Sequence, residues 1–237
     1  MKNVLSILML VAMIGRTAAQ ESFRPELYSL YISNRMIEWT IPMQRVQQQV
    51  QRSADRDMMF DLLLAEYGFI GYCFSKDWND KAAEWVEDAD ALADRLISLD
   101  PSRAAVYAIK AAIYGFRITL HPAKAVFYGP KNKLNIDKAI ELDPGDPIGW
   151  FVYGNSEFFR PAAFGGSKTR GIEYYRKAIG LLEKDPDEME NNWFYLNMLM
   201  MLADAYERTS QAALARETYR KILQVEPRFT ALNEKLR

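Results

Sequence analysis

Cysteine and histidine are almost absent from this chain of 237 residues, each occurring once, as Cys73 and His121. A single cysteine cannot form an intramolecular disulfide, so a disulfide-stapled fold is excluded. The same scarcity would leave a zinc ion with carboxylates for most of its ligands. We therefore expect stability to come from apolar burial, for which a chain with 49% hydrophobic residues has ample material.

Neither sign of charge is in excess, because 30 lysines and arginines face 31 acidic residues, for a net charge of -1. The two signs are interspersed along the chain. Such a balance provides no electrostatic reason to expect binding to nucleic acid or to an anionic membrane surface. We predict that nucleic acid is not a partner.

Long apolar runs are missing apart from Val4 to Ile14, which follows Lys2 and precedes small residues at 17–19. This is the layout of a cleavable secretory signal, and the run is shorter than the roughly 20 residues that span a bilayer. We predict a signal peptide over residues 1–19, with a retained N-terminal anchor as the alternative. Removing its two basic residues takes the net charge to -3, and we expect the mature chain to be soluble, without stable membrane insertion.

Residue patterns typical of catalysis are also missing. His121 stands before a proline in "LHPAK", as a solvated loop residue does, and no serine–histidine–acid signature accompanies it. Cys73 lies among aromatic residues, which favours packing, because a reactive thiol needs an accessible electropositive setting. The glycines of "FGG" at 164–166 lack the spacing of a phosphate-binding loop. We predict a non-catalytic protein without metal or cofactor, and keep a hydrolase that works through carboxylates as the enzymatic alternative.

One acidic stretch, "EWVEDADALAD", invites a calcium interpretation. A calcium site needs oxygens that converge from a loop, whereas these carboxylates spread around a predicted helix. We interpret them as a solvated helix face. They are Glu84, Glu87, Asp88, Asp90 and Asp94.

An acidic residue followed by proline recurs with the prolines at 101, 144, 186 and 227, at intervals of 43, 42 and 41 residues. An amphipathic run with apolar residues three and four apart precedes each pair, as in "NIDKAIELDP". Proline stops a helix because it lacks the N–H and disfavours helical dihedrals in the preceding residue. The spacing predicts a helical repeat of about 42 residues.

The last unit resembles a tetratricopeptide repeat. Small residues allow two antiparallel helices to approach, larger ones fill the space around them, and "ERTSQ" provides a short turn. The residues at the signature positions are Leu199, Leu202, Ala203, Tyr206, Ala215, Tyr219, Ile222 and Pro227. As a whole, the chain also resembles secreted repeat proteins of Gram-negative bacteria, which implies a periplasmic location.

Earlier units follow the pattern less closely. We predict a repeat domain over 55–237, with units at about 55–101, 102–144, 145–186 and 187–227. In the third unit "FFRPAAFGGSKTR" replaces the tight turn, and Ser167 is suited to cap the next helix. Residues 20–54 form an N-terminal segment whose helix, from about Met36 to Gln51, caps the first pair. The predicted fold is all-α, with about nine helices in antiparallel pairs stacked into a right-handed solenoid.

The resemblance implies that the first helix of each pair lines a concave groove for a peptide, a partner helix or a small ligand. In this chain the groove positions are small in one unit, aromatic in the next and polar in the last. They are Ala105, Ala108, Ala112, Gly115 and Phe116, then Ile148, Phe151, Asn155, Phe158 and Phe159, and finally Asn197, Met200, Asp204, Glu207 and Arg208. The alternative for the aromatic set is burial of Phe158, Phe159 and Phe164 by the insertion. The family's carboxylate clamp is not implied, since only Asn155, Asn197 and Arg208 could contribute to one.

Two functions follow from the resemblance. The first is a periplasmic protein-interaction scaffold that binds a polypeptide on the concave face. The second is a binding or carrier protein for a small apolar ligand, associated with a transporter, because small residues beside aromatic ones leave room for an apolar pocket.

Overall fold

The computed structural model describes residues 18–229 and residue 232, and within them it contains helices and no strand. An N-terminal segment comprises α1 (Ala18–Ile32), the 3-10 helix η1 (Met36–Trp39) and α2 (Thr40–Val50). The four pairs are α3 (Arg56–Ser75) with α4 (Asn79–Leu99), α5 (Ala104–Leu120) with α6 (Ala125–Leu142), α7 (Pro147–Phe159) with α8 (Lys168–Leu182), and α9 (Trp193–Arg208) with α10 (Ala212–Val225). Three 3-10 turns connect elements: η2 (Pro122–Lys124), η3 (Ala162–Phe164) and η4 (Pro186–Glu188).

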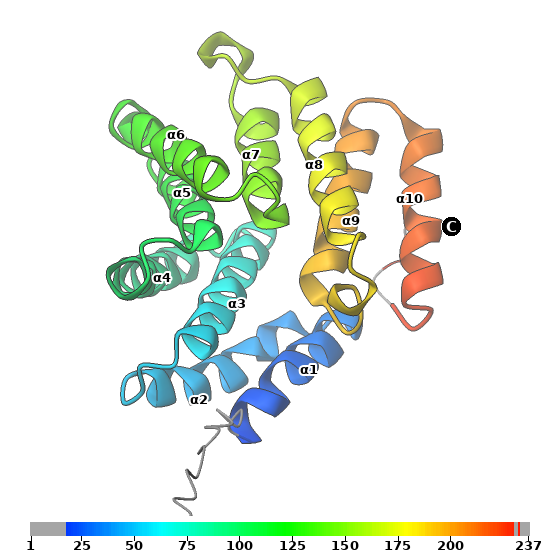
Figure 1. Cartoon of the computed structure of the whole chain (residues 1–237). Coiled ribbons are helices and arrows are strands. Elements are labelled where there is room, and N and C mark those ends of the chain that lie inside the picture. The colour runs from blue at the N-terminus through cyan, green and yellow to red at the C-terminus, as the bar shows by residue number, and fades with distance from the viewer. Residues whose placement is uncertain (1–17, 230–231, 233–237) are drawn as a thin grey trace, which may run out of the picture.

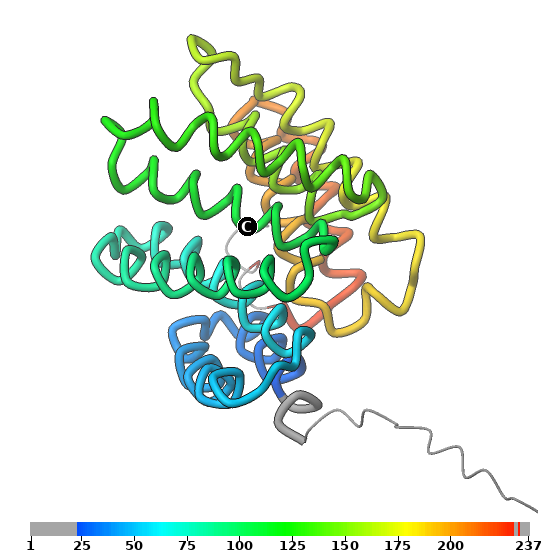
Figure 2. The backbone as a smooth tube through the Cα atoms, turned by 60° about the vertical axis from the view of Figure 1, so that its left-hand side comes forward, coloured from blue at the N-terminus to red at the C-terminus, as the bar shows by residue number. Residues whose placement is uncertain are grey.

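The pairs stack as successive layers (Figure 2), which confirms the predicted all-α fold of stacked antiparallel helix pairs. The predicted signal, residues 1–19, lies outside the described residues except for its last two, which begin α1. The helix expected from Met36 to Gln51 is divided into η1 and α2, and Pro42 is tolerated because it lies in the first turn of α2.

Helix ends follow local chemistry. Asp146 caps α7 by accepting hydrogen bonds from the backbone N–H groups of Ile148 at 2.7 Å and Gly149 at 3.4 Å. Ser167 caps α8 through the N–H of Arg170 at 3.3 Å, as its sequence position predicts. The helices α4, α6 and α10 end one residue before the acidic residue of each acidic-proline pair.

The two helices of the third pair approach each other through glycine. A Cβ on Gly154 of α7 would lie 2.6 Å from the ring of Tyr175 in α8, and one on Gly171 of α8 would lie 2.7 Å from the Cβ of Phe158. Because Tyr175 is fully buried, its ring cannot move aside without disturbing the core. Both glycines are therefore required by the packing of α7 against α8.

The N-terminal segment contacts the last helix pair and the residues that follow it. The ring of Trp39 in η1 lies 4.7 Å from that of Trp193 in α9, and Tyr31 of α1 stacks on Phe229 at 5.4 Å. The hydroxyl of Tyr28 donates a hydrogen bond of 2.8 Å to the buried carboxylate of Glu226. In Figure 1, α1 and α2 lie below α3 and α9, so the N-terminal segment joins the first pair to the last.

Ion pairs also support the contacts of the N-terminal segment with the rest of the fold. Hydrogen bonds from Arg228, with a further one from Tyr28, lower the pKa of Glu226 to about 2. Arg24 of α1 forms a two-fold hydrogen bond with the buried Asp61 of α3, with distances of 2.8 and 2.6 Å. The contacts of Arg24 with Asp61 and of Tyr28 with Glu226 have no counterpart in the local sequence pattern, since the partners are 37 and 198 residues apart.

Several carboxylates of α4 form ion pairs with basic residues of α5, whereas the sequence pattern indicated a solvated helix face. The buried Lys110 of α5 pairs with Asp90 at 2.6 Å and Asp94 at 2.7 Å, and Arg117 pairs with Asp90 and Glu87 at 2.9 Å each. A lysine at an apolar position of the repeat is thus accommodated because α4 supplies carboxylates across the helix interface.

Glu66 of α3 is a buried carboxyl in the core, with 1% of its surface exposed and its Oε2 atom without a hydrogen-bond partner. Burial, with a smaller contribution from the Asp88 carboxylate, raises the pKa of Glu66 well above its usual range. The folded chain therefore retains a proton that the unfolded chain releases above about pH 4.3. The contribution of this group to the unfolding free energy falls as pH rises from there toward the folded pKa.

We expect Glu66→Gln to raise the unfolding free energy at pH 7 by at least about 1.4 kcal/mol, the equivalent of one pKa unit, because the amide needs no proton in the core. The gain should shrink at pH 5, where the unfolded wild-type carboxyl is itself closer to protonation. Urea unfolding of both proteins at the two pH values measures the difference, with the exposed Glu84→Gln as control. Equal gains at both pH values would contradict the buried-carboxyl interpretation.

Candidate functional site

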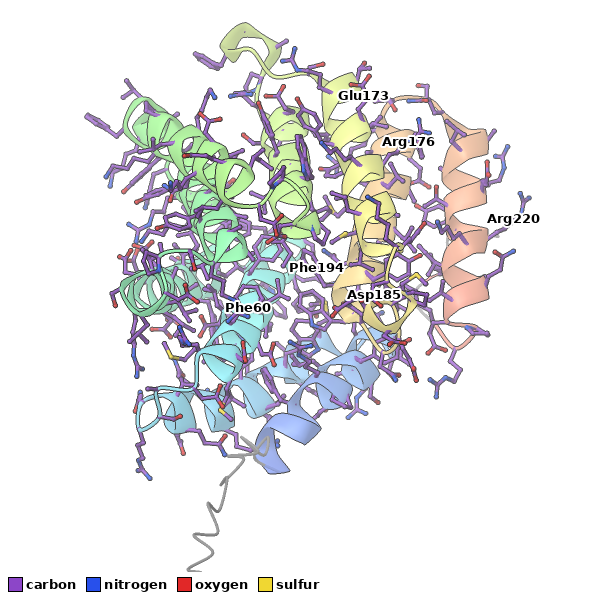
Figure 3. All side chains as sticks on the ribbon, viewed as in Figure 1. Phe60, Glu173, Arg176, Asp185, Phe194 and Arg220 are labelled. Atoms are coloured by element: carbon purple, nitrogen blue, oxygen red, sulfur yellow. The ribbon has the colours of Figure 1, made fainter. Side chains whose placement is uncertain are left out.

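The first helices of the four pairs, α3, α5, α7 and α9, surround a common centre (Figure 1), so the predicted groove has to be located on the inward sides of these helices. Much of that inward side is core. Figure 3 shows Phe194 of α9 at this centre, where its ring contacts Tyr67 of α3 and Phe151 of α7. The predicted positions that are buried are Ala105, Ala108, Ala112, Phe151 and Phe158.

The Tyr67 side chain explains why the predicted groove positions on α5 are buried. Its ring stacks on Phe116 of α5 with a centroid separation of 5.6 Å. The side-chain amide of Asn155 donates a hydrogen bond of 3.0 Å to the Tyr67 hydroxyl and accepts one of 2.6 Å from the Tyr175 hydroxyl. Asn155 thus connects α3, α7 and α8 within the core instead of facing a ligand.

The C-terminal ends of α7 and α9 bring three predicted residues together on the surface. Phe159 is 51% exposed, and the Arg208 guanidinium lies 5.8 Å from the centroid of its ring. Nε of Arg208 lies 2.6 Å from the Asp204 carboxylate, one helical turn earlier in α9. We call Phe159, Asp204 and Arg208 the aromatic–ionic surface.

An ordered connection holds Phe159 in this position. The buried carboxylate of Glu157 is paired with Arg160 and with Arg170, whose Nε lies 2.9 Å away. Arg170 also donates to the carbonyl of Gly165 at 2.7 Å, where the backbone has the left-handed φ of +84° that favours glycine.

The aromatic residues at this connection differ in how far they are buried. Of the three for which burial by the insertion was the alternative, only Phe158 is buried. Phe159 remains half exposed and Phe164 is 75% exposed.

The other predicted positions are dispersed. Asn197 and Met200 of α9 are partly buried, Glu207 is exposed, and Gly115 lies near the buried Asn132. Ile148 lines a hollow of about 550 Å³ between the N-terminal ends of α5 and α7.

This hollow also contains residues that the sequence did not single out. The Arg103 guanidinium lies 4.1 Å from the centroid of the Phe60 ring, and Phe60 of α3 is labelled in Figure 3. Asp146 also lines the hollow, and burial raises its pKa despite the two backbone hydrogen bonds that it accepts. The hollow is therefore lined by both charged and apolar groups.

The remaining chemical groups show no catalytic arrangement in the described residues. Burial raises the pKa of the Cys73 thiol to about 11, so it is a neutral packing group near pH 7. His121 is an exposed residue at the end of α5. Across 18–229 and 232, no three His, Cys, Asp or Glu side chains are grouped to hold a metal ion.

Outward sides of the helices carry charge. Glu173 and Arg176 of α8 and Arg220 of α10 are exposed and labelled in Figure 3. None of the described helices combines the length and apolar character needed to cross a membrane.

Comparison with known families identifies a repeat in the last helix pair. The family model described as "Tetratricopeptide repeat" matches residues 196–229, which include most of α9, all of α10 and the acidic-proline pair at the end of α10. The chain carries a tetratricopeptide repeat. No curated protein sequence matches the chain.

One solved structure, HusA, extends this tetratricopeptide-like repeat fold to most of the chain. The HusA haemophore from Porphyromonas gingivalis is similar with a TM-score of 0.64 and 16% identity, over 82% of this chain and 96% of that one. MamA from Desulfovibrio magneticus RS-1 has a TM-score of 0.38 and 13% identity, over 86% and 96% of the two chains. Yeast Tom70 has a TM-score of 0.23 and 10% identity, over 95% and 63%. The likeness to HusA concerns the fold and not the ligand.

Proposed function

We propose that this chain is a non-catalytic interaction scaffold that binds a polypeptide through the aromatic–ionic surface. A tetratricopeptide-like array presents its surface as a rigid shape, and such arrays commonly bind protein partners. The observation that carries the proposal is the convergence of Phe159 from the third pair with Asp204 and Arg208 from the fourth. Tyrosine, tryptophan and arginine lead among the residues that dominate binding energy at interfaces, with aromatic groups at their centre.

The chemistry of this surface indicates the kind of segment that it accepts. The Phe159 ring offers an apolar contact that is half exposed. The Asp204–Arg208 pair beside it is partly exposed, with 35% and 55% of the two side chains accessible. A segment with an apolar side chain next to a polar or charged group fits both features. We place this binding in the periplasm, a proposal that rests on the signal-like composition of residues 1–19.

A pull-down from envelope extract tests the scaffold function. Wild type should recover a discrete protein, and Phe159→Ala combined with Arg208→Ala should lower the recovered amount at least tenfold, as expected for two central interface residues. Leu99→Ala with Arg220→Ala, at exposed positions of α4 and α10, is the matched control and should recover the same protein. Equal recovery by the aromatic–ionic variant and the wild type would overturn the proposal.

A second candidate function is carriage of a small apolar ligand. It is favoured by the hollow at Phe60, Ala105 and Ile148, whose 550 Å³ would accommodate one small molecule. The name of HusA as a haemophore agrees with this candidate, although the likeness shows only a common fold. Native mass spectrometry of gently purified protein distinguishes the two: a stoichiometric small molecule supports carriage, and its absence removes this candidate.

A further inference from the structure

Three large apolar side chains protrude at one edge of the array. Val126, Phe127 and Phe164 have 72%, 68% and 75% of their surfaces exposed, although neighbouring aromatic residues are packed. Val126 and Phe127 belong to the first turn of α6, and Phe164 belongs to η3 between α7 and α8. Figures 1 and 2 both show these two connections in the upper part of the molecule, with the start of α6 at the left and η3 at the top. We call the three residues the apolar edge.

The apolar edge is held outward by ordered structure. The turn that carries Phe164 is closed by a backbone hydrogen bond of 3.2 Å from Gly166 to Pro161 and by the bond from Arg170 to the Gly165 carbonyl. Beside Phe127, the ring of Tyr128 stacks on Tyr114 of α5 at 6.0 Å. The protruding side chains therefore stand on two rigid supports.

The two sequence segments that carry the apolar edge contain basic residues and no acidic ones, in contrast to the balance of the whole chain. Residues 120–136 and 158–172 contain no aspartate or glutamate. Lys124, Lys131 and Lys168 are exposed, and within the described part of the chain none of the three forms a salt bridge. The arginines of the second segment are already paired with the buried Glu157.

We propose that the apolar edge docks this protein on the surface of a membrane that contains anionic lipids. Exposed aromatic and aliphatic side chains enter the boundary between headgroups and acyl chains, while lysine amines remain at the level of the phosphates. An anionic leaflet complements the two acid-free segments in charge. The attachment is peripheral, and it stands independently of the polypeptide-binding function.

The geometry favours a membrane over a compact ligand or a protein pocket. The hollow at the N-terminal ends of α5 and α7 and the hollow beside Tyr28 and Pro186 are both lined by other residues. Side chains that protrude from two separate connections suit an extended, deformable surface. An exposed apolar cluster of this kind is otherwise typical of a protein interface, and that alternative is an outcome of the test below.

Flotation of the full chain with vesicles tests the proposal. Binding is expected to vesicles rich in phosphatidylglycerol, to weaken with added salt, and to be much lower with phosphatidylcholine alone. Changing Lys124, Lys131 and Lys168 together to Gln should lower the partition coefficient by about 100-fold, since each lysine near an anionic surface contributes roughly a factor of five. Changing the apolar edge to Ser should lower it at least about tenfold.

Matched controls separate these effects from folding and from the N-terminal apolar run. All variants retain residues 1–19, so binding through that run is common to them. Leu99→Ser with Val225→Ser changes exposed residues near the ends of α4 and α10, and Lys138, Lys184 and Lys221 changed to Gln match the lysine set in number. Both controls should bind as wild type does, and circular dichroism should show unchanged helix content in every variant.

Absence of wild-type binding to anionic vesicles would overturn the proposal and leave the edge as a protein interface. Binding that survives both the Ser and the Gln substitutions would overturn it as well, because the attachment would then come from elsewhere in the chain.

Discussion

Trp193→Ala is expected to lower the unfolding free energy by about 3–5 kcal/mol, as removal of a buried tryptophan commonly does. The Trp193 side chain is 5% exposed, and its ring lies 4.7 Å from Trp39 and 6.0 Å from Tyr31. It also covers Gly68 of α3, where no space remains for a Cβ. One side chain thus joins the N-terminal segment, the first pair and the last pair.

Urea unfolding followed by circular dichroism measures this loss. Trp78→Ala is the control, because Trp78 is 39% exposed at the turn between α3 and α4 and should cost less than about 1 kcal/mol. Hydrogen exchange should become faster in α1 when Trp193 is removed, since its anchoring to α9 is lost. A loss no larger than that of Trp78→Ala would mean that the meeting of the chain ends contributes little to the fold.

Gly171→Ala is expected to destabilise the chain by about 2–3 kcal/mol, although alanine is the better helix former. The added methyl group would lie 2.7 Å from the Phe158 Cβ and 3.0 Å from the Gly154 carbonyl oxygen. Neither atom is the end of a flexible side chain, so α7 and α8 must separate.

Gly180 lies on the same helix and provides the matched control. A Cβ there would meet no atom within 4 Å, so Gly180→Ala should raise the unfolding free energy by about 0.5–1 kcal/mol through helix propensity alone. Thermal unfolding of the two variants beside wild type measures both signs. Similar effects at the two positions would show that the close approach of α7 and α8 is not what requires glycine.

Local patterns predict most of the fold. The acidic-proline pairs mark where α4, α6 and α10 end, since proline at the next position cannot continue a helix. Ser167 predicts the start of α8, and Ala203 with Ala215 predicts the contact between α9 and α10, where both are buried. These features depend on residues close together in the chain, so a sequence pattern records them.

No local sequence pattern predicts the contacts between the N-terminal segment and the last pair. The helix α1 was not predicted, because Pro25 lies within it, although the buried Phe23, Leu27 and Tyr31 recur at helical spacing. Glu226 was assigned only to the stop signal after α10, whereas its carboxylate binds Tyr28 across nearly the whole chain. Contacts of this kind depend on how tightly the array curves, which the repeat consensus does not specify.

The candidate site was predictable only in part for the same reason. The predicted groove residues lie on the first helices of their pairs, α5, α7 and α9. Which of them stay exposed depends on Tyr67 of α3, which fills the centre beside Phe116 and Asn155. The surviving surface at Phe159 exists because the buried Glu157 fixes the connection outside the core.

Local charge was hidden by the overall composition. A net charge of -1 led to the expectation that an anionic membrane surface is not a partner, and that expectation concerns the whole chain only. The acid-free segments at the start of α6 and around η3 are short, so their excess of lysine and arginine is averaged out in the net charge of the whole chain.

Site-specific photo-crosslinking at Phe159 tests the proposed function most directly. A benzophenone side chain placed at Phe159 in living cells should give one discrete adduct with a polypeptide, and the added substitution Arg208→Glu should abolish it. The same group placed at Leu99, an exposed position at the end of α4, should give none. Adducts that form equally at both positions, or only at Leu99, would contradict the assignment of polypeptide binding to the aromatic–ionic surface.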